Sequence, residues 1–156
     1  MLDPLTDFPQ LRAVLWDHNL RTVDLGTLGG NSNGATSVNS RGQVVGFALN
    51  AMAEDPAIAA FFICGLPAAQ QVRAFLWQGG AMHDLGTLGG NDSHATFINE
   101  PGNVTGFSST NTQINDTTGL PTFHPFLWKN GRLQDLGSLG GSRPNRAASL
   151  MAPGVG

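Results

Sequence analysis

The chain has 156 residues, of which 12% are charged, and it contains 21 glycines, nine prolines and a single cysteine. This length suits one compact domain, and a single cysteine excludes an internal disulfide framework. A net charge of −3 with only eight basic residues creates no basic field for a phosphate backbone, which argues against nucleic acid as a partner.

In chain order, the predicted elements form three copies of one unit. An apolar strand ends in Leu-Trp, and the block Asp-Leu-Gly-(Thr/Ser)-Leu-Gly-Gly follows it. A third strand, a glycine-containing turn and a fourth strand then complete the unit. We therefore predict one domain over residues 1–156, built from four-stranded antiparallel meanders at about 11–50, 73–110 and 124–156.

Two inserts separate the units. Residues 51–72 are rich in alanine, and Asp55 followed by Pro56 predicts the N-cap and the first turn of a short helix. Residues 111–123 are polar and rich in turn formers. Insertions on a repeat scaffold gather on one face and usually carry binding, so we expect a ligand or partner to contact these segments.

The third unit is shorter than the other two. Residues 146–154 follow the third-strand pattern, and no fourth strand comes after them. An unpaired strand edge is a template for another strand. We therefore expect either that residues 6–11 fold back onto this edge or that a second copy pairs with it as a homo-oligomer.

The recurring strings resemble one known repeat family. Ala-Phe-Leu-Trp at 74–77, Asp-Leu-Gly-Thr-Leu-Gly-Gly at 84–90 and Gly-x-Val-x-Gly at 102–106 are similar to the HAF-type repeats, described as probable extracellular repeats of bacteria. The resemblance covers two units in full and one in part, and it implies an exported protein. Residues 1–7 carry no signal-peptide pattern, and no run of about 18 apolar residues predicts a membrane span. Localisation stays open at this point.

Two architectures fit this pattern. A four-stranded repeat of this size resembles a propeller blade, although closed propellers ordinarily contain four or more blades. Three four-stranded units also match a β-trefoil. We predict an all-β fold of propeller-blade-like repeats that is incomplete at the C-terminus, with the β-trefoil as the alternative.

Three aspartates recur at one position of the unit. Because Asp24, Asp84 and Asp135 are repeated in every copy, we expect them to serve the fold by accepting hydrogen bonds from turn amides. Catalysis is the less favoured role for them.

Two turns that differ between the first and second units are more informative. The second unit has Asn91, Asp92 and His94 before its third strand and Asn99 and Glu100 after it. The first unit has Asn31-Ser32-Asn33-Gly34 and Asn39-Ser40 at these places. Oxygen ligands of this kind suit Ca²⁺, so Asn91, Asp92, Asn99 and Glu100 are the candidate metal ligands. His94 and Asp92 are the candidate catalytic groups, with His94 as a general base. The strand between the two groups spans roughly 17 Å, so one site would recruit only one end.

Two functions follow from these features. The favoured one is a non-catalytic repeat module that binds a surface ligand or another chain through its loops and inserts. The alternative is a Ca²⁺-dependent hydrolase of small esters or lactones, such as acyl-homoserine lactones, by analogy with calcium-dependent lactonases built on propellers.

Overall fold

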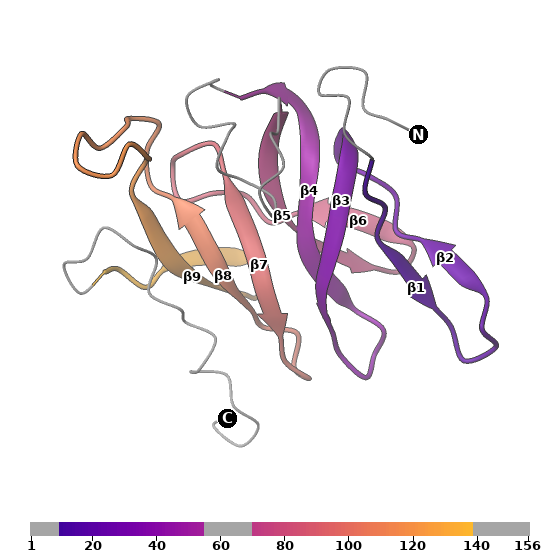
Figure 1. The fold of residues 1–156 in the computed structure, drawn as a ribbon. Helices are drawn as coiled ribbons and strands as arrows, with labels where there is room; N and C mark the ends of the chain where they lie inside the picture. The colour runs from indigo at the N-terminus through magenta and orange to yellow at the C-terminus, as the bar shows by residue number, and fades with distance from the viewer. Residues whose placement is uncertain (1–9, 55–69, 139–156) are drawn as a thin grey trace.

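The computed structural model describes residues 10–54 and 70–138, which form β-strands joined by turns and loops (Figure 1). The prediction of an all-β fold is confirmed. The expected helix after Asp55, the single cysteine (Cys64), residues 6–9 of the expected N-terminal strand and the segment 146–154 lie outside the described residues. Among the residues that are described there is no helix, so none is long and apolar enough to cross a membrane.

The described residues form ten strands in three antiparallel sheets. The first is the hairpin of β1 (Val14–Trp16) and β2 (Thr22–Asp24). The second contains, in spatial order, β3 (Gly29–Val38), β4 (Val44–Ala53), β5 (Gln70–Gln78) and β6 (Ala81–Asp84). The third contains β7 (Ser93–Ile98), β8 (Val104–Ser109), β9 (Phe123–Lys129) and β10 (Arg132–Asp135).

The strands of one repeat unit are divided between two sheets, which differs from the meander that the sequence predicts. The third and fourth strands of one unit, β3 and β4, pair with β5 and β6, the first and second strands of the next unit. The reason lies in the Asp-Leu-Gly-Thr-Leu-Gly-Gly block. The backbone N–H of Leu85 in this block still donates to the carbonyl of Ala74 (2.9 Å). The chain then leaves the sheet. The block therefore links two sheets instead of closing a hairpin within one.

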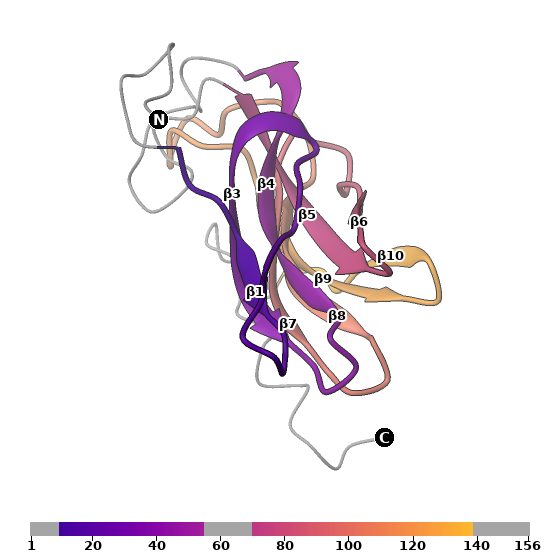
Figure 2. The same cartoon turned by 90° about the vertical axis from the view of Figure 1, so that its right-hand side faces the viewer.

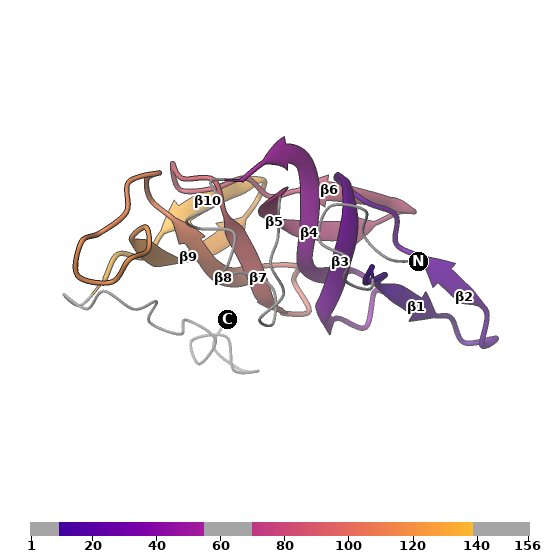
Figure 3. The same ribbon diagram turned by 45° about the horizontal axis from the view of Figure 1, so that its top comes forward.

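The two four-stranded sheets and the hairpin stand in a row, as Figure 3 shows. Figure 2 shows the outer strands β6 and β10 on the same side of the molecule. One buried cluster joins the two large sheets; it contains Val45, Ala74, Leu76, Leu85, Ala95, Ile98, Val104 and Phe126. A second cluster joins the hairpin to the other face of the first large sheet; it contains Ala13, Leu25, Val44, Ala48 and Phe75. Both faces of β4 are thus covered, which explains its unbroken buried run from Val44 to Leu49.

Side chains also connect the two innermost strands, β3 and β7. The hydroxyl of Thr36 donates to the carbonyl of Ala95 (2.9 Å), and the amide Nδ2 of Asn39 donates to the carbonyl of Asn99 (3.1 Å). Each of these pairs is one repeat apart, at separations of 59 and 60 residues. Asn39 therefore meets its own counterpart in the next sheet, and Thr36 meets the residue before its counterpart, Thr96.

The three repeated tryptophans differ in burial. Trp77 and Trp128 pack against the two buried clusters, whereas Trp16 in β1 is 62% exposed. Within residues 10–54 and 70–138, β1 pairs with β2 alone. The equivalent strands β5 and β9 also pair with β4 and β8, so the second edge of β1 lacks the described partner that its two counterparts have.

Candidate functional site

The repeated aspartates hold turns, as the sequence predicts. One carboxylate oxygen of each accepts the backbone N–H two residues later: Asp24 from Gly26 (2.8 Å), Asp84 from Gly86 (2.7 Å) and Asp135 from Gly137 (2.7 Å). The hydrogen bond from Gly26 and the guanidinium of Arg12 hold the pKa of Asp24 below its ordinary value. The prediction that these carboxylates accept hydrogen bonds from turn amides is confirmed.

A basic side chain faces each of these aspartates. Arg12 Nη2 lies 2.9 Å from Asp24 Oδ2, Arg73 Nε lies 3.8 Å from Asp84 Oδ2, and His124 Nδ1 lies 2.9 Å from Asp135 Oδ2. The three bases occupy the same repeat position, one residue before the apolar strand motif. Sequence reasoning missed this partner because its chemical type changes from arginine to histidine.

We expect Asp84→Ala to lower the free energy of unfolding by about 1 kcal/mol, because the amide of Gly86 loses its acceptor. Urea denaturation followed by circular dichroism measures the loss. Asp116→Ala, which removes an exposed carboxylate from the loop before β9, is the matched control and should stay within about 0.5 kcal/mol of the wild type. Equal losses in the two variants would contradict the role assigned to the turn.

Asp92 occupies a structural position that Ser32 fills in the first unit. Ser32 Oγ accepts the backbone N–H of Leu11 (3.2 Å), and Asp92 Oδ1 accepts that of Val72 (2.9 Å). Each bond ties the start of a unit's third strand to the first-strand segment of the same unit, which lies in the neighbouring sheet. Asp92 is 1% exposed, and its own N–H donates to Ser109 Oγ (3.0 Å). Burial raises the pKa of Asp92 to about 7, and the carboxylate of Glu54 adds to this increase.

Asn91 contacts Glu54, the carboxylate that acts on Asp92. Its Nδ2 donates to Glu54 Oε1 (3.3 Å), and Glu54 is only 8% exposed. Asn91, Asp92 and Glu54 therefore form one buried polar group where the end of β4 meets the start of β7. Sequence reasoning missed Glu54, because it lies in an insert 38 residues before Asp92.

His94 does not point into this group. Its ring stacks between two phenylalanines, with centroids 4.8 Å from Phe47 and 5.1 Å from Phe107. Burial lowers the pKa of His94, with the backbone of Ala95 acting in the opposite direction. The neutral ring thus serves as part of an aromatic stack between the two large sheets.

Asn99 and Glu100 lie at the other end of β7. Asn99 Oδ1 accepts the N–H of Asn103 (2.8 Å) and closes the turn before β8. Glu100 accepts hydrogen bonds from the backbone N–H (3.1 Å) and the hydroxyl of Ser40, and the bond from the hydroxyl holds the pKa of Glu100 below its ordinary value.

The four predicted calcium ligands therefore do not converge. The six residues of β7 separate Asn91 and Asp92 from Asn99 and Glu100 by roughly 20 Å. Within residues 10–54 and 70–138, no three His, Cys, Asp or Glu side chains are grouped to hold a metal ion.

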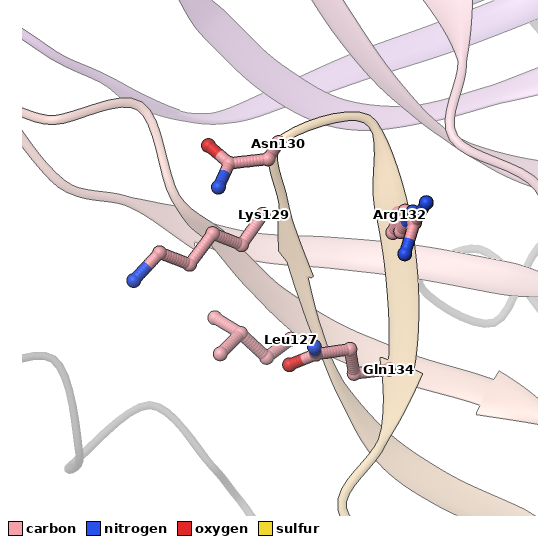
Figure 4. Close-up of a pocket in the computed structure, with 5 residues that line it drawn as sticks. All are labelled: Leu127, Lys129, Asn130, Arg132 and Gln134. Carbon is pink, nitrogen blue, oxygen red and sulfur yellow. The ribbon is translucent and has the colours of Figure 1, made fainter.

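The structure adds a groove on the β9–β10 hairpin, with a volume of about 600 Å³ (Figure 4). Leu127, Lys129 and Asn130 line it from β9 and its turn, and Arg132 and Gln134 line it from β10. The turn itself is repeated, because Asn130 and Gly131 have positive φ like Gly79 and Gly80 of the second unit.

The side chains around that turn are particular to the third unit. Lys129 and Arg132 replace Gln78 and Ala81 of the second unit. A comparison of the three copies was able to reveal this difference, but only the structure shows that the two cations border one groove.

No protein-family model matches this chain, and neither a curated protein nor a solved structure matches it at a significant level.

Proposed function

We propose that this chain is a non-catalytic β-repeat module that binds an acidic, hydroxyl-rich ligand, such as a carboxylated surface glycan, in the β9–β10 groove. The observation that carries the proposal is the composition of this groove. Two cations, two amides and one aliphatic side chain line it, and no carboxylate is among them.

The chemistry of these side chains fits such a ligand. Arg132 offers a planar guanidinium that pairs with a carboxylate through two parallel hydrogen bonds, and Lys129 adds a second positive charge. The amides of Asn130 and Gln134 both donate and accept hydrogen bonds, as hydroxyl groups require. A volume of about 600 Å³ lies within the range of small-ligand sites.

The scaffold supports this division of roles. The repeated aspartates, Asp92 and Glu100 all accept hydrogen bonds that hold turns or join sheets. The pairing of Thr36 with Ala95 and of Asn39 with Asn99, each one repeat apart, supports blade-like packing of successive sheets. We propose this blade-like arrangement, together with the HAF-type assignment, as the description of the repeat. A further strand from a second copy would extend it at the open edge of β1.

The competing proposal is the Ca²⁺-dependent lactonase. It requires His94 to act on a metal-bound water, but the His94 ring is stacked between Phe47 and Phe107. The groove proposal needs no such rearrangement and is therefore preferred. Turnover of acyl-homoserine lactones that disappears with a chelator and in His94→Gln would reverse this order.

We expect Lys129→Ala and Arg132→Ala each to weaken binding of trigalacturonate by about 5- to 10-fold, because each removes one charge-assisted contact. The double variant should show no measurable binding. Isothermal titration calorimetry measures the affinity, and raising the salt concentration from 50 to about 500 mM should weaken it further.

Arg21→Ala is the matched control, since it removes one exposed cation from the turn between β1 and β2. This variant should bind like the wild type, and maltotriose, which has no carboxylate, should bind more weakly than trigalacturonate. Binding that is unaffected by both groove substitutions would refute the site, and absence of trigalacturonate binding by the wild type would refute the ligand class.

A further inference from the structure

The first strand of the first unit has one edge that no described strand covers. Within residues 10–54 and 70–138, β1 pairs with β2 alone, and Figure 1 shows it beside β3. Its counterparts β5 and β9 each have a second neighbour, which is the fourth strand of the preceding unit: β5 pairs with β4, and β9 pairs with β8. The hairpin therefore lacks, among the described residues, a neighbour that this repeat uses twice.

The side chains around this edge are correspondingly exposed. In the cluster between the two large sheets, Val45 of β4 is buried with three residues of the second unit, namely Leu76, Ala95 and Ile98. The counterparts of these three in the first unit are Leu15, Ala35 and Val38. Val38 is 54% exposed whereas Ile98 is 2% exposed, and Ala35 is exposed whereas Ala95 is buried. The difference arises because no described residue takes the place of Val45 one repeat earlier.

A groove with a volume of about 240 Å³ lies between β1 and β3. Its lining contains no charged side chain; the residues are Val14, Leu15, Ala35, Thr36, Ser37, Val38 and Val44. Trp16, at the end of the same strand, is 62% exposed. An unpaired strand edge offers hydrogen bonds to an added strand, and a pocket beside that edge selects the side chains of the added strand. The edge of β1 and this groove together have the features of a strand-binding site.

We propose that this edge binds an extended segment of another chain with the pattern Val-(Val/Thr)-Gly-Phe, which is the pattern of the repeat's own fourth strand. The proposal rests on the blade-like packing proposed above. The chain shows this occupant twice, because β4 and β8 carry the pattern at residues 44–47 and 104–107. Both set it in one register, with the valine opposite the repeated tryptophan and the glycine two residues further on opposite phenylalanine.

The same register on β1 defines the contacts of the bound segment. Its valine lies opposite Trp16, its next residue opposite Leu15 and its glycine opposite Val14. The residue opposite Leu15 enters the groove beside Val38, as Val45 does among the counterparts of these residues in the next sheet. The segment is thus recognised by backbone hydrogen bonds along β1 and by one β-branched side chain in the groove.

The test uses the whole chain and a fluorescein-labelled peptide with the sequence of residues 103–110, Asn-Val-Thr-Gly-Phe-Ser-Ser-Thr. Fluorescence anisotropy should show saturable binding, and a peptide with the same residues in scrambled order should bind at least about 10-fold more weakly. In a second measurement, the unlabelled peptide should shift the tryptophan emission to shorter wavelengths, because it covers Trp16. Trp16→Phe should lose most of this shift and should still bind the peptide.

Two substitutions locate the binding site. Val38→Asp puts a carboxylate in the apolar groove and should weaken peptide binding by at least about 10-fold. Met52→Asp is the matched control, because Met52 is 60% exposed and is not among the residues that line the groove. This control should bind the peptide like the wild type. Circular dichroism checks that both variants are folded, and the wild-type titration with the two peptides decides the proposal even if Val38→Asp is not.

Four results would overturn the proposal. The wild type could show no saturable binding up to about 1 mM peptide, or it could bind the scrambled peptide equally well. Binding that requires deletion of residues 1–8 would show that the N-terminal segment of the same chain covers the edge. Dimers in sedimentation velocity that Val38→Asp abolishes and the peptide does not dissociate would assign the edge to a second copy.

The double variant of Lys129→Ala and Arg132→Ala separates this test from that of the glycan site. It should bind the peptide like the wild type, because neither residue lines the groove beside β1. A failure of the glycan proposal therefore leaves the outcome of the peptide titration unchanged.

Discussion

Gly106→Ala is expected to lower the free energy of unfolding by about 3 kcal/mol, one of the largest losses from a single methyl group in this chain. Gly106 faces Ala95 across the β7–β8 pair. An added Cβ would collide with the carbonyl oxygen of His94 and would lie 2.9 Å from Ala95 Cα and 2.7 Å from Phe126 Cζ. Two of these three neighbours are backbone atoms, so the clash can be relieved only by opening the strand pair. Urea denaturation of the wild type and the variant measures the loss.

Gly131→Ala is the control, because it makes the same chemical change for a different reason. Gly131 has φ of +76°, but a Cβ there would meet no atom within 4 Å. Its cost is the strain of a left-handed backbone alone, about 1 kcal/mol. A Gly106→Ala loss no greater than that of Gly131→Ala would show that β7 and β8 are not in such close contact.

Lowering the pH from 8 to 5 in EDTA is expected to stabilise the wild type, relative to Asp92→Asn, by roughly 2–3 kcal/mol. The pKa of Asp92 rises from an ordinary 3.8 to about 7 on folding. Between these two values the folded state binds more protons than the unfolded state. The stabilisation is therefore complete below about pH 4 and is lost as the pH rises through 7.

Comparison with Asp92→Asn isolates this effect from other groups. His94 has a lowered pKa, so it acts in the opposite direction below pH 6.5, but it does so equally in both proteins. Asp24 and Glu100 have lowered pKa values and lose their stabilising effect only below about pH 4. Free energies of unfolding from urea titrations at pH 5 and pH 8 give the difference. Parallel pH profiles for the two proteins would show that Asp92 ionises normally in the folded state.

Local features of the repeat were readable from residue types. An Asp followed two residues later by Gly predicts a side-chain acceptor on a turn amide, and all three copies show that bond. The alternation of apolar residues and the turns through Gly42 and Gly102 predict strands, and the described strands β4 and β8 follow those turns. These features depend on neighbours along the chain, so one sequence is sufficient to predict them.

Contacts between residues that are distant in the sequence could not be predicted in this way. Glu54 meets Asp92 because β4 extends through the first part of an insert, to Ala53, and returns as β5 from Gln70. The separation of Asn99 and Glu100 from Asp92 is different, because it follows from the length of β7, which the sequence predicts. A periodic pattern reports spacing along one strand, whereas these contacts depend on which strand lies beside it.

The sequence by itself determined the all-β class, the threefold repeat and the role of its aspartates, because each follows from residue type and local spacing. Only the tertiary structure decided that one unit is shared between two sheets, that Lys129 and Arg132 border one groove, and that Glu54 lies with Asp92. The physical reason is that strand pairing and sheet packing join residues far apart in the chain. The repeated Asp-Leu-Gly-Thr-Leu-Gly-Gly block can either connect two strands of one sheet or link two different sheets. Burial on both faces of β4 selects the second arrangement.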